Sequence, residues 1–201
     1  MNQIFMEKGY LHIPNFITTV EAEILTKQFK QYVNTQNAIG DSQVQASKTV
    51  YNFLPFVLLL VNKIPEVTKL YGHYVLPTYT YARIYYKGAE LKEHIDRPAC
   101  EISLTLNLSK TQNWPIFFKT RENQIVNIEL NPGDAAMYLG CERPHWREVY
   151  DGEEHTQVFL HYVSAYGDNN WAFFDKTTVK PKTPNYLDAH AATQIPLVIY
   201  E

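Results

Sequence analysis

A histidine and an aspartate two positions apart, His94 and Asp96, are the residues of this chain best suited to chemistry. In a β-strand, residues two apart project from the same face, so this imidazole and carboxylate would converge on one point. A third ligand must come from a distant strand, and His145, which follows a Pro-Gly-Asp turn, can supply it. Two imidazoles and one carboxylate on one face of an octahedron leave three positions open, as in non-haem iron(II) sites. His94, Asp96 and His145 are therefore the candidate metal ligands and catalytic residues.

The first third of the chain predicts three helices. Thr18 can cap the free amides of the first helix, and Glu21 can reach back to it. Asn52 can cap the second helix, and Pro65 suits the first turn of the third. The expected helices cover residues 18–33, 52–60 and 65–71. The polar segment 36–51 is expected to be a loop and is a candidate lid.

From residue 78 onward, segments rich in β-branched and aromatic residues are separated by Gly, Pro and Asn at short intervals. We expect strands over Thr78–Lys87, Lys92–Asp96, Glu101–Leu108, Pro115–Lys119, Gln124–Leu130, Asp134–Leu139, His145–Tyr150 and Thr156–Ser164. Short strands after a helical layer predict a mainly β fold with N-terminal helices, a double-stranded β-helix or cupin-like jelly roll. In that fold His94 and Asp96 lie on the second core strand and His145 opens the seventh. A chance His-x-Asp pair and a merely structural His145 are then the weaker interpretation.

The length of the chain, 201 residues, suffices for a sizeable core but is short for two ordinary domains. We expect one domain over 1–201, made of a helical layer (17–72), a jelly-roll core (78–164) and a tail (165–201) that wraps the outside.

The charge pattern argues against a nucleic-acid partner, because the net charge is −3 and Lys and Arg form no basic stripe. The first residues lack the features of a signal peptide, and no apolar run approaches the roughly 20 residues that span a bilayer. The two cysteines, Cys100 and Cys141, lie in unrelated contexts, so no disulfide is implied. A cytoplasmic protein without membrane contact is the expectation. The sequence leaves the oligomeric state open.

The segments around the triad resemble the iron(II)/2-oxoglutarate-dependent dioxygenase superfamily. Residues 83–96 are similar to its strand, Tyr-x-x-Gly turn and His-x-Asp unit, and residues 132–138 to its Pro-Gly-Asp turn and following strand. Local similarity extends to the AlkB and prolyl hydroxylase branches, and residues 77–83, 100–103 and 145–148 resemble an uncharacterised bacterial and phage group. The resemblance implies Fe(II), 2-oxoglutarate as co-substrate and O₂, with hydroxylation of a substrate and release of succinate and CO₂.

The chain departs from that family where the distal carboxylate of 2-oxoglutarate is usually anchored. The family has an Arg or Lys about ten residues after the second histidine, and this chain has His155. The AlkB-branch pattern Arg-x-Asn-x-x-x-Arg is replaced by His155, Gln157 and His161 at the same spacing. These residues could still contact the co-substrate, or the two histidines could be packed and satisfied.

A cation for the co-substrate must then come from elsewhere. Arg147, on the same strand face as His145, is the first candidate, and Arg83 is the second. Arg147 could instead pair with Glu148 or Asp151 at the rim. Tyr85 matches the family tyrosine that contacts 2-oxoglutarate.

Side chains around the triad carry further expectations. Glu101, Ser103 or Gln157 could orient the two histidine rings. Arg97 is expected to point away from Asp96, toward Glu101, because adjacent strand residues project from opposite faces. The alternative is that Arg97, Glu93 or Lys92 lines the mouth of the site.

The substrate is the least defined part of the prediction. A small molecule and a protein side chain both suit a compact barrel, and a methylated nucleobase suits it less because no basic groove is evident. Two other functions stay open. One is a non-catalytic jelly-roll binding module that keeps the fold. The other is a cupin-type metal dioxygenase with a different co-substrate, although cupins usually bind metal through more histidines.

Overall fold

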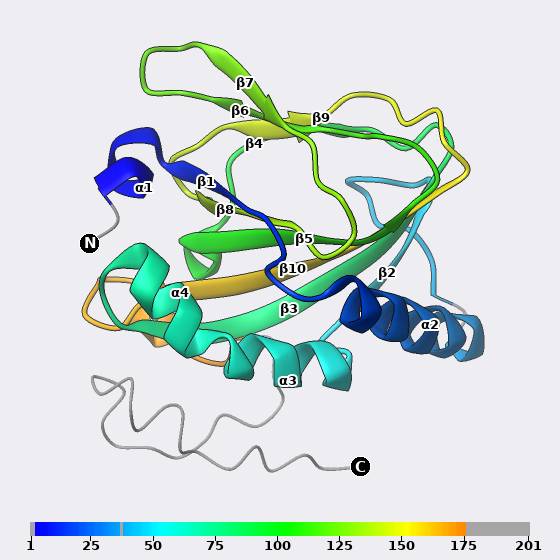
Figure 1. Ribbon diagram of the computed structural model, residues 1–201, viewed down its shortest axis with the longest axis horizontal. Coiled ribbons are helices and arrows are strands. Elements are labelled where there is room, and N and C mark those ends of the chain that lie inside the picture. The colour runs from blue at the N-terminus through cyan, green and yellow to red at the C-terminus, as the bar shows by residue number, and fades with distance from the viewer. Residues whose placement is uncertain (1–2, 37, 176–201) are drawn as a thin grey trace.

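Two antiparallel β-sheets form the body of the molecule, whose computed structural model describes residues 3–36 and 38–175. The strands are β1 (Tyr10–Ile13), β2 (Ser47–Tyr51), β3 (Val75–Tyr86), β4 (Leu91–His94), β5 (Ile102–Lys110), β6 (Ile116–Lys119), β7 (Ile125–Ile128), β8 (Ala135–Leu139), β9 (His145–Arg147) and β10 (Glu154–Ser164). One sheet has the order β1-β8-β5-β10-β3-β2, and the other has the order β4-β9-β6-β7. Figure 1 shows the smaller sheet lying over the larger one. This arrangement, with helices preceding it, confirms the predicted double-stranded β-helix.

Helices cover the outer face of the larger sheet. They are α1 (Gln3–Lys8), α2 (Thr19–Thr35), α3 (Leu54–Asn62) and α4 (Ile64–Tyr71). Two short 3-10 turns, η1 (Pro98–Cys100) and η2 (Asn170–Ala172), belong to a different cluster, which includes residues that line the cavity described below. In Figure 1, α2, α3 and α4 lie beneath the sheet, on the side away from the smaller sheet. Phe29, Phe56 and Val67 of these helices are fully buried in one cluster with Leu104 and Leu160 of the sheet. Each such side chain contributes about 1.5–3 kcal/mol of burial free energy, which fixes the sheet that carries the site.

The capping prediction for α2 is confirmed. The hydroxyl oxygen of Thr18 accepts a hydrogen bond from the backbone N–H of Glu21 at 3.1 Å, and the Thr18 N–H donates to the Glu21 carboxylate at 2.8 Å. This reciprocal pair satisfies two amide groups at the start of the helix.

The capping prediction for Asn52 is wrong. Asn52 has a φ of 50°, outside the extended conformation that a capping residue needs, and α3 begins after Phe53 without a side-chain cap. The side-chain oxygen of Asn52 instead accepts a hydrogen bond from the N–H of Thr80 at 3.0 Å. Asn52 therefore ties the start of α3 to β3.

The segment 36–51 was expected to be a loop, but only part of it is one. Its last five residues form β2, which pairs in antiparallel register with β3 from Ser47 opposite Tyr85 to Tyr51 opposite Tyr81. Neither α1 nor β1 was predicted from the sequence. Both unpredicted strands, β1 and β2, lie at the edges of the larger sheet, where pairing with a single neighbour decides their conformation.

The second core strand is shorter than expected, because β4 ends at His94 and Asp96 lies in the irregular segment that follows. Later in the chain, part of the segment 165–175 packs inward, with Phe173 and Phe174 buried at 3% and 4% exposure, while Tyr166 and Trp171 are exposed. The first part of the tail, which was expected to wrap the outside from residue 165 onward, is thus partly buried. The rest of the expected tail, residues 176–201, lies outside the part of the chain that the structure describes.

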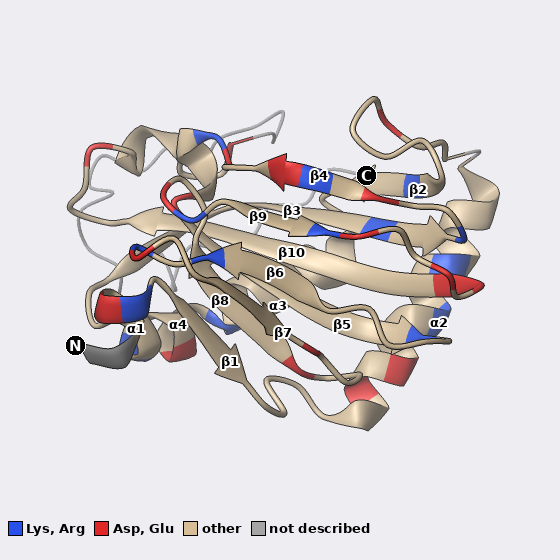
Figure 2. Ribbon diagram, turned by 90° about the horizontal axis from the view of Figure 1, so that it is seen from above, with Lys and Arg blue, Asp and Glu red and all other residues tan. Residues whose placement is uncertain are grey.

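Charged residues of both signs are mixed over the molecule, as their spread along the sequence indicates. In the view of Figure 2, Lys and Arg are interspersed with Asp and Glu over the elements. Cys100 and Cys141 are both free. Within the described ranges, no helix is long and apolar enough to cross a membrane.

Candidate metal centre and its cavity

The three predicted ligands meet at one point. His94, the last residue of β4, and His145, the first of β9, are register partners across the smaller sheet. Asp96 reaches the same point from the irregular segment, where its N–H donates to the carbonyl of Gly140 at 2.8 Å. Oδ1 of Asp96 lies 3.7 Å from Nε2 of each histidine, and the ligand atoms of the triad lie within 4.8 Å of one another.

Hydrogen bonds orient both rings for metal binding. Nδ1 of His94 donates to the carbonyl of Lys92 at 2.8 Å, and Nδ1 of His145 donates to the carbonyl of Arg143 at 2.8 Å. Since a carbonyl only accepts, each Nδ1 carries the proton, and each Nε2 presents its lone pair. Burial lowers the pKa of His145 and keeps that ring neutral. Two such nitrogens and a carboxylate oxygen fit a divalent metal ion.

The partners of the triad differ from those expected. Backbone carbonyls, and not Glu101, Ser103 or Gln157, orient the two rings. Ser103 instead donates a hydrogen bond to Oδ2 of Asp96 at 3.0 Å. The serine thus fixes the carboxylate rather than an imidazole.

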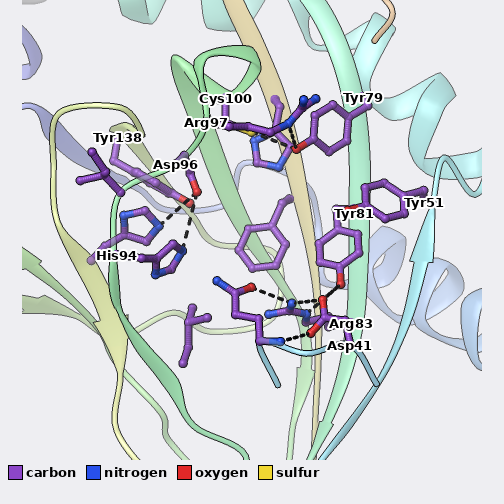
Figure 3. A pocket seen from close by; sticks show the side chains of 16 residues that line it. Asp41, Tyr51, Tyr79, Tyr81, Arg83, His94, Asp96, Arg97, Cys100 and Tyr138 are labelled. Atoms are coloured by element: carbon purple, nitrogen blue, oxygen red, sulfur yellow. Dashed lines mark hydrogen bonds and ion pairs between the residues drawn. The ribbon is translucent and has the colours of Figure 1, made fainter. Parts of the chain in front are cut away.

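A cavity of about 250 Å³ opens beside the triad. Figure 3 shows His94 and Asp96 on one side and the side chains of Tyr51, Tyr79 and Tyr81 facing them from the other. The rings of Tyr51 and Tyr81 lie 4.5 Å apart, and those of Tyr51 and Tyr79 5.7 Å apart. A molecule in this cavity would therefore lie between the triad and an aromatic wall.

Arg83 lines the cavity but already has a counter-ion. Its guanidinium pairs with the carboxylate of Asp41 and donates to the side-chain oxygen of Gln43 at 2.8 Å. Tyr81 also donates its hydroxyl proton to Asp41. Burial alone would raise the pKa of Asp41, but these bonds and the N–H of Val44 outweigh it and lower the pKa. The segment that carries Asp41 is therefore attached to the cavity wall.

Arg97 also lines the cavity, which agrees with the alternative that it lies at the mouth and not with the expectation that it points away from Asp96. It pairs with Asp175 and stacks on the ring of Tyr79 at 5.1 Å. Because β4 ends at His94, the alternation of strand faces does not extend to this residue.

Arg147 lies behind the triad in a polar cluster that does not line this cavity. It is 1% exposed, donates to the carbonyl of Trp114 and donates to the side-chain oxygen of Gln157 at 2.9 Å. The expected alternative, a rim pair with Glu148 or Asp151, is wrong, and Arg147 has no carboxylate partner among the residues described. Burial lowers the pKa of Arg147 to about 10, so the side chain is still a cation at neutral pH.

The same cluster holds three other residues predicted for co-substrate binding. Nε2 of His155 lies 3.1 Å from the side-chain oxygen of Gln157, and the ring of Tyr85 lies 6.2 Å from that of His155. Three buried atoms here have no hydrogen-bond partner within the described part of the chain, namely Nε of Arg147, Nδ1 of His155 and Nε2 of Gln157. Burial, followed by the charge of Arg147, lowers the pKa of His155, so its ring is neutral.

His161 is separated from that cluster and lines the main cavity. Its Nδ1 lies 2.9 Å from the hydroxyl of Ser103, and burial lowers its pKa to about 4. Beside it, Sγ of Cys100 lies 3.0 Å from the hydroxyl of Tyr79, and burial raises the pKa of the thiol to about 12. No role was predicted for Cys100 or Asp41 from the sequence, because both reach the cavity only through the fold.

Several solved structures have a fold similar to that of this chain, at low sequence identity. A Pseudomonas putida prolyl-4-hydroxylase matches over 80% of this chain and 95% of its own, with a TM-score of 0.67 and 11% identity. The epimerase SnoN in complex with Fe³⁺, alpha ketoglutarate and nogalamycin RO matches over 90% of each chain, with a TM-score of 0.70 and 12% identity. HygX from Streptomyces hygroscopicus with nickel and 2-oxoglutarate matches over 81% of this chain and 85% of its own, with a TM-score of 0.64 and 13% identity. No family model and no curated protein matches the sequence.

Proposed function

We propose that this chain, whose fold is that of iron(II)/2-oxoglutarate dioxygenases, is itself such an enzyme and hydroxylates a small molecule or a protein side chain. The observation that carries the proposal is the convergence of Nε2 of His94, Oδ1 of Asp96 and Nε2 of His145 beside a cavity. Backbone carbonyls fix both rings in the tautomer that a metal requires.

The bound iron(II) and 2-oxoglutarate would supply the oxidation, in which O₂ converts 2-oxoglutarate to succinate and CO₂ and hydroxylates a C–H bond of the substrate. His94, Asp96 and His145 would hold the metal ion through two imidazole nitrogens and one carboxylate oxygen. Tyr138, 1% exposed with its ring 4.6 Å from that of His145, helps to exclude water from the far side of the triad.

Arg147 is the proposed anchor for the distal carboxylate of 2-oxoglutarate. A buried cation that has no carboxylate partner among the described residues favours an anionic ligand, and the unpaired N–H groups at Nε of Arg147 and Nε2 of Gln157 could donate to it. Tyr85 closes this cluster. Arg83 is the weaker candidate because Asp41 already neutralises it.

The substrate class follows from the cavity only in broad terms. Among the structural neighbours, HygX is seen with hygromycin B, and a Trichoplax adhaerens prolyl hydroxylase with a peptide fragment. The aromatic wall of Tyr51, Tyr79 and Tyr81 would accept the apolar part of either kind of ligand.

Anaerobic binding of Fe(II), followed by 2-oxoglutarate, tests the proposal by calorimetry. The wild type should bind one Fe(II) per chain and then bind 2-oxoglutarate more tightly than without metal. His94→Ala should lose both. Unchanged Fe(II) binding in His94→Ala would refute the triad, and metal binding without any 2-oxoglutarate binding would indicate another co-substrate.

A further inference from the structure

Asp96 faces a second group of potential ligands besides the triad. Its Oδ1 lies 3.7 Å from Nε2 of His94 and of His145, while its Oδ2 accepts the hydrogen bond from Ser103. The Ser103 hydroxyl in turn lies 2.9 Å from Nδ1 of His161. The two oxygens of one carboxylate therefore have different neighbours.

The second group consists of Asp96, Cys100 and His161. One carboxylate oxygen, Sγ of Cys100 and one ring nitrogen of His161 lie within 4.8 Å of one another. Cys100 comes from η1 and His161 from β10, and at 3% and 5% exposure both line the cavity. Ligand atoms around tetrahedral zinc lie about 3.3–3.8 Å apart, given bond lengths of about 2.0–2.3 Å. An ion would therefore draw these side chains together by small rotations.

We propose that Asp96, Cys100 and His161 form a second metal site, which takes a thiophilic divalent ion such as Zn²⁺ or Cd²⁺. A thiolate, an imidazole and a carboxylate are ligands that such ions prefer, whereas the triad contains no sulfur. The hydrogen bond of His161 uses Nδ1, so Nε2 is the nitrogen available to the ion. Binding must displace the proton of Cys100 and its contact with the hydroxyl of Tyr79.

The shared carboxylate couples this site to the first one. An ion bound by Cys100 and His161 would also bind the carboxylate of Asp96 and so weaken the binding of iron by Asp96. Loading the second site should therefore inhibit turnover, a consequence that rests on the proposed oxygenase function. Metal binding itself does not depend on that function.

A Cd²⁺ titration of the iron-free full-length protein tests the site through the ultraviolet charge-transfer band of a cadmium–thiolate bond. Cys141, the other cysteine, provides the matched control. The wild type, Cys141→Ser and His94→Ala should each show a saturable band with one equivalent of Cd²⁺. Cys100→Ser should lose the band, and His161→Asn should bind Cd²⁺ at least about tenfold more weakly, since one ligand is lost.

Several results would overturn the second site. These are no band in the wild type, loss of the band in Cys141→Ser or His94→Ala, its persistence in Cys100→Ser, or unchanged affinity in His161→Asn. Cys141→Ser keeps the native Cys100, so it decides the question even if Cys100→Ser does not fold. The band is independent of 2-oxoglutarate turnover, so failure of the oxygenase proposal and failure of this site are distinguishable.

Discussion

His94 and His145 are paired across the β4–β9 ladder, with their ring centroids 4.3 Å apart. Sheet pairing thus makes neighbours of two residues that are distant in the chain. Asp96 completes the group because the backbone passes close by at Gly140, whose carbonyl accepts the Asp96 N–H. The metal centre therefore depends on a residue that supplies no ligand.

Replacing Gly140 should damage the metal centre directly. A Cβ at this position would lie 2.2 Å from the carbonyl oxygen of Cys100 and 2.5 Å from Oδ2 of Asp96. We expect Gly140→Ala to lower the unfolding free energy by about 1–3 kcal/mol, as overpacking does, and to weaken Fe(II) binding at least about tenfold. Urea unfolding and anaerobic calorimetry measure the two effects.

Gly88→Ala is the matched control. Gly88 has a φ of +83°, but nothing lies within 4 Å of the added Cβ. The substitution should lower the unfolding free energy by about 1–3 kcal/mol through backbone strain and leave the affinity for Fe(II) unchanged. Equal loss of metal affinity in both variants would mean that general destabilisation, and not displacement of Asp96, explains the effect.

The two candidate arginines should respond differently to removal. Arg147→Gln should raise the KM for 2-oxoglutarate about 10- to 100-fold, because charge-assisted hydrogen bonds are worth about 1.5–3 kcal/mol. Arg83→Gln should change that KM by less than about threefold, since Arg83 is already paired with Asp41. Steady-state succinate assays over a range of 2-oxoglutarate concentrations give both values, and the reverse order would assign the anchor to Arg83.

Removing Asp41 should leave Arg83 without a counter-ion. Arg83 is 1% exposed, while the Asp41 side chain is 35% exposed, so the cost is below that of a fully buried pair. We expect Asp41→Ala to lower the unfolding free energy by about 1–2 kcal/mol. The double variant Asp41→Ala/Arg83→Met removes both charges. Its loss of unfolding free energy should therefore be smaller than the sum of the losses in the two single variants. Additive losses in urea unfolding would show that the pair has no coupling energy.

Stability should depend on pH through Asp134, which connects the end of β1 to β8. Its carboxylate accepts the N–H groups of Asn15 at 2.9 Å and Asn131 at 3.0 Å. Burial alone would raise the pKa, but these bonds outweigh it and lower the pKa. The stabilisation is therefore complete above the unfolded-state pKa of about 3.9 and is lost as the pH falls through the lower folded pKa.

The matching variant is Asp134→Asn. At pH 7 it should be about 2 kcal/mol less stable than the wild type. The negative charge is removed, and the NH₂ group of the asparagine cannot accept the hydrogen bond that one carboxylate oxygen of Asp134 accepts. The difference should shrink as the pH is lowered below 4. A difference in unfolding free energy that stays constant with pH would show that ionisation of Asp134 is not its source.

Local patterns predicted the parts of this fold that local chemistry determines. The Thr18–Glu21 pair marked the start of α2, and strand composition predicted that a strand begins at His145. The edge strand β2 escaped prediction because its sequence, Ser-Lys-Thr-Val-Tyr, has little alternation, and its conformation depends on pairing with β3.

The surroundings of the site depend on contacts between distant segments. Asp96 was expected on a strand, but the bond from its N–H to Gly140 holds it outside β4. The pairing of Arg83 with Asp41 joins a strand to a polar segment that carries no motif. Spacing in the sequence indicated His94, Asp96 and His145 as candidate ligands, whereas the residues that contact them could be found only from the three-dimensional arrangement.

The most direct test of the central proposal is succinate formation from 2-oxoglutarate by the purified protein, with Fe(II) and O₂ and without added substrate. The wild type should show slow turnover that requires Fe(II), and His94→Ala should show none. Turnover that persists in His94→Ala, or no turnover by a wild type that binds both Fe(II) and 2-oxoglutarate, would contradict the account.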